Sequence, residues 1–159
     1  MIQMMHEEFL RKALTLALQN VRACVGGPFA AVIVQDGTII AEGCNEVTWR
    51  NDPTAHAEVV AIRRACKTLG TFDLSSCELY TSCEPCPMCA GAIHWARLRK
   101  VYYAATRDDA ARAGFDDARM HEEVARPLDA RSIPHIQLSI EDVSAAFEEW
   151  AKSPNKVRY

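Results

Sequence analysis

The chain has 159 residues, of which 49% are hydrophobic and 25% are charged. This length and composition are typical of one domain with a packed core, and they exclude a mainly disordered, collagen-like or coiled-coil chain. The formal net charge of -3 argues against a protein that grips a nucleic-acid backbone, because phosphate binding needs a clustered basic face.

Apolar runs and cysteine usage indicate the compartment. No apolar run approaches the roughly 20 residues that span a bilayer, so no membrane association is expected. The apolar stretch at 13–18 is too short for an export signal, and Glu7 and Glu8 precede it. The seven cysteines are an odd number, and four of them lie between residues 77 and 89. Metal ligation explains them better than disulfides, and we expect a cytoplasmic protein.

The first half of the chain predicts a helix, a hairpin and a second helix. Apolar residues recur at helical spacing over residues 6–23. Two apolar runs, 29–34 and 38–44, flank Asp36-Gly37, which is a strong hairpin signal. A helix then follows the capping oxygens and proline of 52–54 and ends before Gly70.

The second half alternates strands and helices. We expect a strand at 78–81, a helix from Pro87 to about Ala96, and a strand at 101–104. A polar segment at 107–125 precedes an edge strand at 135–140 and a last helix near 141–151. This order predicts an α/β fold, a three-layer α/β/α sandwich around a central mixed five-stranded sheet, as a single domain over residues 1–159.

Three metal-ligand side chains open two of these helices. His56 lies at the start of the second helix, and Cys86 and Cys89 lie at the start of the third. A catalytic zinc ion takes three protein ligands, often His and Cys, and leaves a fourth position for water. Two cysteines three apart at a helix start lie on one side of the first turn, where the helix dipole favours thiolate. We therefore predict Zn²⁺ bound by His56, Cys86 and Cys89.

Glu58 follows His56 by two positions, and residues so spaced do not share a helix face. Glu58 is therefore poorly placed as a fourth ligand and well placed to move protons beside the metal. The pattern H-x-E with P-C-x-x-C resembles the signature of zinc-dependent deaminases. It predicts attack of metal-activated hydroxide on an electron-poor ring carbon, with Glu58 carrying protons to the ring nitrogen and the departing amine.

Other metal sites fit parts of this pattern. A structural zinc site would need four closed ligands and no free carboxylate. Cys83, Cys86 and Cys89 repeat every three residues like part of an iron–sulfur run, but Ile93 stands where the fourth cysteine belongs. We interpret Cys83 as a packed thiol near the site, and its replacing one of the two cysteine ligands stays open.

The segments DPTAHAE, TSCEPCPMCAGAIHWAR and AGFDD make this chain similar, over nearly its whole length, to bacterial guanine deaminases of the cytidine deaminase-like superfamily. The zinc motifs indicate the superfamily, whereas AGFDD and an aromatic tail ending in Tyr159 point to guanine. The resemblance implies hydrolysis of guanine to xanthine and ammonia by attack at C2.

The resemblance also implies roles for individual residues. Zinc would be held by His56, Cys86 and Cys89, and Glu58 would be the general acid and base. Substrate contacts would come from Phe29, Asn45, Trp95, Asp117 and Tyr159. An ionised Asp117 only accepts hydrogen bonds, which suits the N1 and 2-amino donors of guanine, and such a site rejects rings with a lone pair there. Without the resemblance, a helix cap or a solvated acid explains Asp117 equally well.

A homodimer is a further implication, in which the tail at 152–159 is exchanged and closes the partner's pocket. Pro154 ends the last helix, and a short polar tail follows with Tyr159 as its aromatic anchor. A frayed terminus would have the same sequence, so both interpretations stay open.

Several rival functions share the zinc motifs. A tRNA adenosine deaminase has a similar length, but the late segment of this chain is rich in Asp and Glu, which disfavours a nucleic-acid partner. Deaminases of guanosine, cytosine or triazines remain alternatives because ring choice depends on pocket shape. A non-catalytic zinc-binding module would have no use for Glu58. We favour an enzyme acting on a small purine base.

Overall fold

A computed structural model describes residues 2–159 and has a four-stranded sheet at its centre, in the order β2-β1-β3-β4. The strands are β1 (Ala30–Gln35), β2 (Thr38–Cys44), β3 (Cys77–Cys83) and β4 (Lys100–Ala105). Strand β1 is antiparallel to both of its neighbours, whereas β3 and β4 are parallel. The sheet is therefore mixed, as predicted.

The hairpin between β1 and β2 has the turn that the sequence predicts. Asp36 and Gly37 both have positive φ angles, 48° and 78°. A two-residue turn of this kind matches the twist of the strands, and glycine adopts the left-handed conformation without a steric penalty. Gln35 and Thr38 pair directly across the turn.

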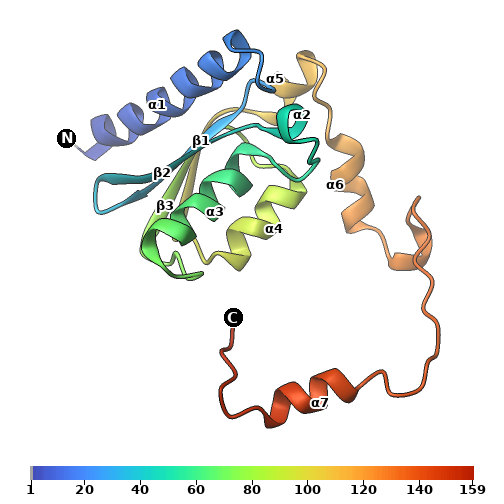
Figure 1. The fold of residues 1–159 in the computed structure, drawn as a ribbon. Helices are drawn as coiled ribbons and strands as arrows, with labels where there is room; N and C mark the ends of the chain where they lie inside the picture. Colours follow the sequence, from blue (N-terminus) through green and yellow to red (C-terminus); the bar gives the residue numbers. More distant parts are fainter. Residues whose placement is uncertain (1) are drawn as a thin grey trace.

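Helices cover both faces of the sheet (Figure 1). Helix α1 (Ile2–Arg22) packs on one face, where Val32 and Tyr80 form a core with Phe9 and Leu10. Helices α3 (Ala57–Leu69) and α4 (Pro87–Trp95) lie side by side on the other face. Because alternate residues of a strand point to opposite faces, β1 contributes to both cores. The predicted three-layer sandwich is confirmed.

Close packing between α3 and β2 fixes the start of α3. A Cβ atom added at Gly43 would lie 2.3 Å from the backbone oxygen of Ala57 and 2.5 Å from the backbone nitrogen of Ala61. Ala57, Ala61 and Ala65 are all fully buried. Small residues on both sides therefore bring the helix close to the strand, and the residue before α3 is held with it.

The segment predicted as polar, residues 107–125, contains two short helices. Helix α5 (Arg107–Arg112) begins with a capping box between Thr106 and Asp109, and α6 (Ala118–Ala125) follows. The structure also has α2 (Val47–Arg50), the short 3₁₀ helix η1 (Leu128–Ala130) and α7 (Ala145–Lys152). Helices α2 and η1 are too short to show a hydrophobic period. Helices α5 and α6 have no buried residues, so their sequences also give no clear helical signal.

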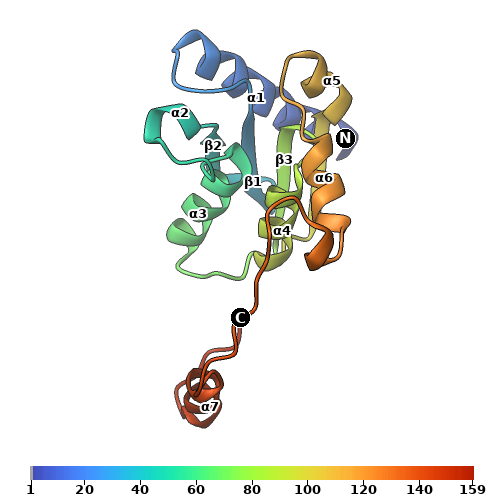
Figure 2. The same cartoon turned by 90° about the vertical axis from the view of Figure 1, so that its right-hand side faces the viewer.

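The predicted fifth strand at residues 135–140 is not formed, so the prediction of a five-stranded sheet was wrong. Ile136, Leu138 and Ile140 alternate with polar residues, but this segment is unpaired in the described chain. A strand requires an edge that accepts its backbone hydrogen bonds. The chain leaves the body after α6 and η1 and does not return to an edge of the sheet (Figure 2).

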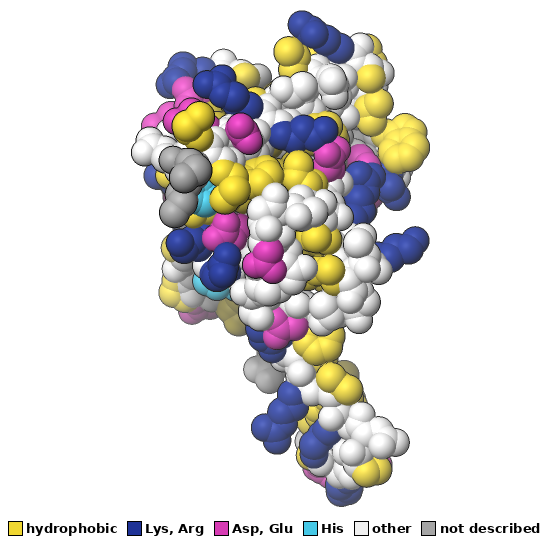
Figure 3. Space-filling model, turned by 90° about the vertical axis from the view of Figure 1, so that its left-hand side faces the viewer, with side chains coloured by type: hydrophobic (Ala, Val, Ile, Leu, Met, Phe, Trp, Pro, Cys, Tyr) yellow, Lys and Arg dark blue, Asp and Glu magenta, His cyan; other side chains and the backbone are white. Residues whose placement is uncertain are grey.

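Residues 131–159 are here called the C-terminal arm. Its first residues still contact α6, since Arg131 donates to the backbone oxygen of Val124 and the Ser132 amide donates to Glu123. Helix α7 stands apart from the body, and Figure 3 shows the arm as a projecting lobe. The arm exposes large apolar side chains, with Ile136 80% and Phe147 75% exposed. Only its tip returns: the Tyr159 ring lies 6.0 Å from the Trp95 ring and 6.4 Å from the Phe72 ring, between centroids. Across residues 2–159, no helix combines the length and apolar character that a bilayer span requires.

Candidate active site

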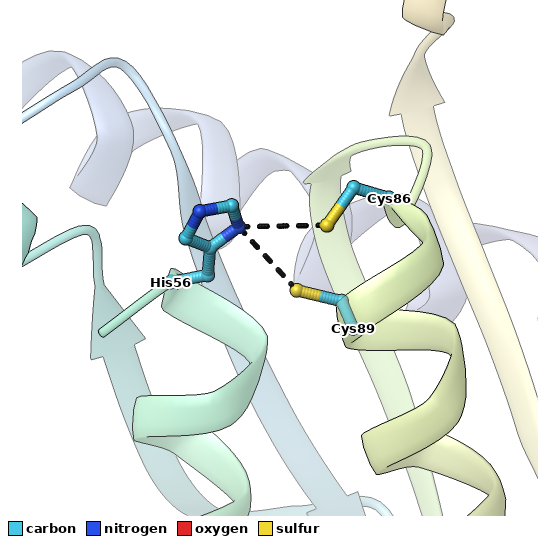
Figure 4. Close-up of side chains that lie close together, drawn as sticks. All are labelled: His56, Cys86 and Cys89. Atoms are coloured by element: carbon cyan, nitrogen blue, oxygen red, sulfur yellow. Dashed lines mark hydrogen bonds between the residues drawn. The ribbon is translucent and has the colours of Figure 1, made fainter. Parts of the chain in front are cut away.

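The starts of α3 and α4 bring the three predicted metal ligands together (Figure 4). His56 and Cys86 are extended residues that cap the two helices, and Cys89 lies in the first turn of α4. Pro87 occupies the first turn of α4, where its fixed φ favours a helix start. The His56 Nδ1 atom lies 3.6 Å from the Sγ atoms of both Cys86 and Cys89.

These distances fit a tetrahedral zinc ion. Zinc–nitrogen bonds of about 2.0–2.1 Å and zinc–sulfur bonds of about 2.3 Å, meeting at the tetrahedral angle, separate N and S by about 3.6 Å. The ligand atoms of His56, Cys86 and Cys89 all lie within 4.8 Å of one another. No other trio of such side chains converges this closely in residues 2–159. One imidazole and two thiols are a donor set that zinc prefers.

The two thiols differ in acidity. A hydrogen bond from Cys89 lowers the pKa of Cys86 to about 4, and His56 adds to this effect. The same hydrogen bond, with burial, raises the pKa of Cys89. The pKa of His56 is raised by its hydrogen bond with Cys86. Cys86 is therefore the more acidic of the two thiols.

Glu58 lies beside the ligands, in the first turn of α3, and is 6% exposed. One carboxylate oxygen accepts a hydrogen bond from the Thr81 hydroxyl at 3.1 Å, and the other accepts from the Cys89 thiol at 3.3 Å. Burial raises the pKa of Glu58. A carboxyl group with a raised pKa takes and gives protons near neutral pH more readily than an ordinary one.

His56 and Cys86 face a cavity of about 490 Å³, and Cys89 is buried behind them. Its lining includes His56, Glu58 and Cys86, together with the predicted substrate contacts Phe29, Asn45 and Asp117. This volume is in the usual range for sites that bind small molecules. The structure thus joins two of the predicted metal ligands, the buried acid and these three substrate candidates in one cavity.

The side-chain amide of Asn45 is hydrogen-bonded through its oxygen, which leaves its nitrogen available. Its Oδ1 atom accepts hydrogen bonds from the backbone amides of Gly27, at 3.3 Å, and Val47, at 3.4 Å. Asn45 is 8% exposed. Because the oxygen is occupied, the Nδ2 group is the part that remains to donate to a ligand in the cavity.

Asp117 and Phe115 come from the loop before α6. The Oδ2 atom of Asp117 lies 3.3 Å from His121 Nε2, and the Asp117 side chain is 23% exposed. Phe115 also lines the cavity, and its ring meets the Phe29 ring edge-on, with centroids 5.0 Å apart. Phe115 was not among the predicted substrate contacts because it lies in a segment interpreted as polar, although the AGFDD motif contains it.

Trp95 and Tyr159 do not line this cavity. Trp95 is 69% exposed at the far end of α4, and the helix rise places it about 12 Å along the axis from Pro87. Both residues line a separate groove between α3 and α4. Nearness to Cys89 in sequence therefore does not bring Trp95 to its own chain's metal site.

Cys83 lines the cavity but is not one of the three converging ligands. Its thiol donates a hydrogen bond to the backbone oxygen of Thr106 at 3.5 Å. Burial raises the pKa of Cys83 to about 11. This position agrees with a packed thiol near the site.

Comparison with known proteins agrees with this geometry. The family described as "Cytidine and deoxycytidylate deaminase zinc-binding region" matches residues 3–105. Guanine deaminase of Bacillus subtilis (strain 168) is 56% identical over 156 residues, covering 98% of this chain and 100% of that protein. An X-ray structure of guanine deaminase from Bacillus subtilis superimposes with a TM-score of 0.95, covering 97% of this chain and 98% of that one.

Two further similarities are partial. The tRNA-specific adenosine deaminase of Agrobacterium fabrum (strain C58) is 50% identical over 78 residues, which cover 49% of this chain and 51% of that protein. The crystal structure of NE0047 in complex with 2,6-diaminopurine is 41% identical, with a TM-score of 0.68, covering 70% of this chain and 62% of that one. With the converging His56, Cys86 and Cys89 side chains, these matches establish that the chain belongs to the cytidine and deoxycytidylate deaminase zinc-binding family.

Proposed function

We propose that this protein is a zinc-dependent guanine deaminase, which hydrolyses guanine to xanthine and ammonia. The observation that carries the proposal is the 56% identity to a guanine deaminase over 98% of the chain. That likeness includes regions beyond residue 105, where the match to the zinc-binding family ends. The AGFDD loop and the C-terminal arm lie in this later part of the chain.

The ligand trio and Glu58 divide the chemistry between them. Zinc held by His56, Cys86 and Cys89 would polarise a water molecule and lower its pKa toward about 7. Glu58 would take a proton from that water and pass it to the ring nitrogen. It would then take the proton of the hydroxyl group added at C2 and pass it to the departing amine. The hydrogen bond from Thr81 holds the carboxylate in place for these transfers.

The cavity residues would orient the base. The Nδ2 group of Asn45 would donate to an acceptor atom of guanine, since its Oδ1 atom is already bound by Gly27 and Val47. Asp117 would accept from the N1 and 2-amino groups. Phe29 and Phe115 supply apolar walls for a flat ring. A ring with a lone pair facing Asp117 would be rejected.

We further propose a homodimer in which the C-terminal arm is exchanged between subunits. The arm leaves apolar side chains exposed on its own chain, and exposed apolar surface of this kind is typical of a subunit interface. Tyr159 lies next to Trp95 and away from its own metal cavity. Exchange would place Tyr159 of one subunit over the cavity of the other.

The main alternative is a tRNA adenosine deaminase, which the partial likeness to such enzymes supports. Glu84, Asp116 and Asp117 line the cavity and disfavour an RNA backbone. None of the seven cysteines forms a disulfide in the described chain, which supports a reducing compartment such as the cytoplasm.

One assay tests the function directly. Ammonia release is measured from guanine, guanosine, cytosine, adenine and an adenosine-containing tRNA loop, with and without a zinc chelator. We expect release from guanine alone and its loss with chelator. Turnover of the tRNA loop without turnover of guanine would overturn the proposal.

A further inference from the structure

Glu46 is a buried carboxylate that the proposed chemistry does not use. It directly follows Asn45 and is 5% exposed. Its Oε1 atom accepts a hydrogen bond from Arg64 Nη2 at 2.6 Å, and its Oε2 atom accepts one from Arg50 Nε. Arg50 ends α2, whereas Arg64 lies within α3. Glu46 therefore joins the short helix α2 to the helix that follows the metal ligand His56.

Backbone hydrogen bonds close the same loop. The amide of Glu46 donates to the oxygen of Ala55 at 2.9 Å, and the amide of Arg50 donates to the oxygen of Glu46 at 2.9 Å. Arg64 also donates to the backbone oxygen of Glu42 at 2.9 Å, which anchors it to β2. The loop between Asn45 and His56 is thus held at Glu46 from both sides.

The contacts of Glu46 with Arg50 and Arg64, here called the clamp, act on Asn45 through Val47. Val47 is the first residue of α2, and its backbone amide donates to Asn45 Oδ1. Charge-assisted bonds to both carboxylate oxygens fix the position of Glu46, and with it the start of α2. If the clamp opened, the Val47 amide would move and the Asn45 side chain would lose one of the two bonds that set its orientation.

We propose that Glu46 is a positioning residue for substrate binding: through Arg50, Arg64 and Val47 it keeps the Nδ2 group of Asn45 directed at the base. The inference rests on the proposed function in one respect, namely that Asn45 contacts the substrate. Glu46 lies next to the cavity lining without being part of it.

The test replaces Glu46 by Gln, which removes the charge and keeps the size. We expect KM to rise and kcat/KM to fall about 10- to 100-fold, with kcat and zinc content nearly unchanged, because substrate orientation is lost and proton transfer is not. Arg64→Gln removes one of the two arginine contacts of Glu46, together with the bond to the Glu42 backbone, and leaves the Arg50 contact, so it should shift KM in the same direction by less. This variant keeps the test open if Glu46→Gln folds poorly.

Glu78→Gln is the matched control. Glu78 is also largely buried, and it accepts hydrogen bonds from Arg99 at 3.1 Å and from the Tyr80 hydroxyl at 2.9 Å. It lies near the start of β3, away from the cavity lining. Loss of an arginine–carboxylate contact should lower thermal stability in both variants, but only Glu46→Gln should change KM. An equal KM change in both would overturn the proposal.

Two measurements separate positioning from general stability. In an Asn45→Ala background, Glu46→Gln should reduce kcat/KM less than about twofold further, because the two residues act through one contact. Fully additive losses would contradict this. Amide hydrogen exchange at residues 45–50 should accelerate in Glu46→Gln. This readout needs no substrate, so unchanged exchange overturns the inference even if the wild-type protein fails to deaminate guanine.

Discussion

The Thr81 hydroxyl donates a hydrogen bond to the Glu58 carboxylate over 3.1 Å. Thr81 lies in β3 and is 1% exposed, whereas Glu58 lies in the first turn of α3. The bond therefore connects the sheet to the helix that starts at His56. It fixes one carboxylate oxygen in the core and leaves the other next to Cys89.

Glu58→Gln should keep the fold and the zinc but lose turnover. The amide oxygen of Gln still accepts from Thr81, whereas proton transfer, which contributes about 10²- to 10⁴-fold, is removed. Steady-state ammonia release and zinc analysis on the same sample check this. Glu42→Gln, which alters a partly exposed acid paired with Lys12 and away from the cavity lining, is the control. Wild-type rates in Glu58→Gln would refute the proposed role.

Cys86→Ala should release zinc, because a site with two remaining ligands binds the ion weakly. Cys83→Ala is the matched variant, since Cys83 lines the same cavity without joining the ligand trio. Elemental analysis after dialysis should show loss of metal in the first variant and retention in the second. The reverse pattern would mean that Cys83 is the ligand.

Zinc affinity should weaken as the pH falls. A thiol binds zinc as the thiolate, so protons and zinc compete for the same sulfur. The pKa of Cys89 is raised by its hydrogen bond with Cys86, so the metal-free protein retains that proton at neutral pH. Competition with a chelator of known affinity, across the range from about pH 6 to about pH 8, measures the effect. An affinity independent of pH would contradict it.

The proposed arm exchange predicts complementation between two inactive proteins. Deleting residues 157–159 should impair turnover, because Tyr159 would no longer cover a cavity. Mixing this truncated protein with full-length Glu58→Gln under conditions that allow subunit exchange should restore activity. In the mixed dimer, the truncated subunit has Glu58 and receives the intact tail of the other.

Each protein alone, taken through the same exchange procedure, is the control for complementation. Light scattering should show that both form dimers. Full activity of the truncated protein by itself would show that the tail is only a terminus. An inactive mixture that contains mixed dimers would show that the tail does not act across subunits.

Asp109 should stabilise the protein in a pH-dependent way. Hydrogen bonds from the Thr106 backbone amide and hydroxyl lower the pKa of Asp109 below that of an unfolded aspartate, about 3.9. Its contribution is therefore present above that value and is lost as the pH falls through the lower folded pKa. Asp109→Asn should be less stable than wild type at neutral pH, with the difference vanishing in acid. Urea unfolding across this pH range, with Asp108→Asn as control, checks it.

Local signals in the sequence predicted the parts of the fold that depend on local interactions. Asp36-Gly37 forms the predicted turn because its two backbone conformations suit few other residue pairs. His56, Cys86 and Cys89 converge as predicted because the capping positions of two neighbouring helices point to the same end of the sheet.

The remaining features depend on contacts that the sequence does not specify. The alternation around Leu138 favours a strand, but no edge of the sheet reaches it. Phe115 enters the cavity because a loop brings it against Phe29, a contact between residues far apart in sequence. Glu46 looks like an ordinary surface acid until the fold brings Arg64 to it.

The exposed apolar side chains of the C-terminal arm also affect whether the chain aggregates during its synthesis and folding. A newly synthesised chain whose arm is not yet paired with a second subunit exposes Ile136 and Phe147 to water, and exposed apolar surface of this kind promotes aggregation. The yield of folded protein would then depend on how fast two chains form a dimer, and that rate rises with the local concentration of the chain. We expect a chain without the arm to remain a monomer that does not aggregate, and to lack the lid that the proposed arm exchange would supply.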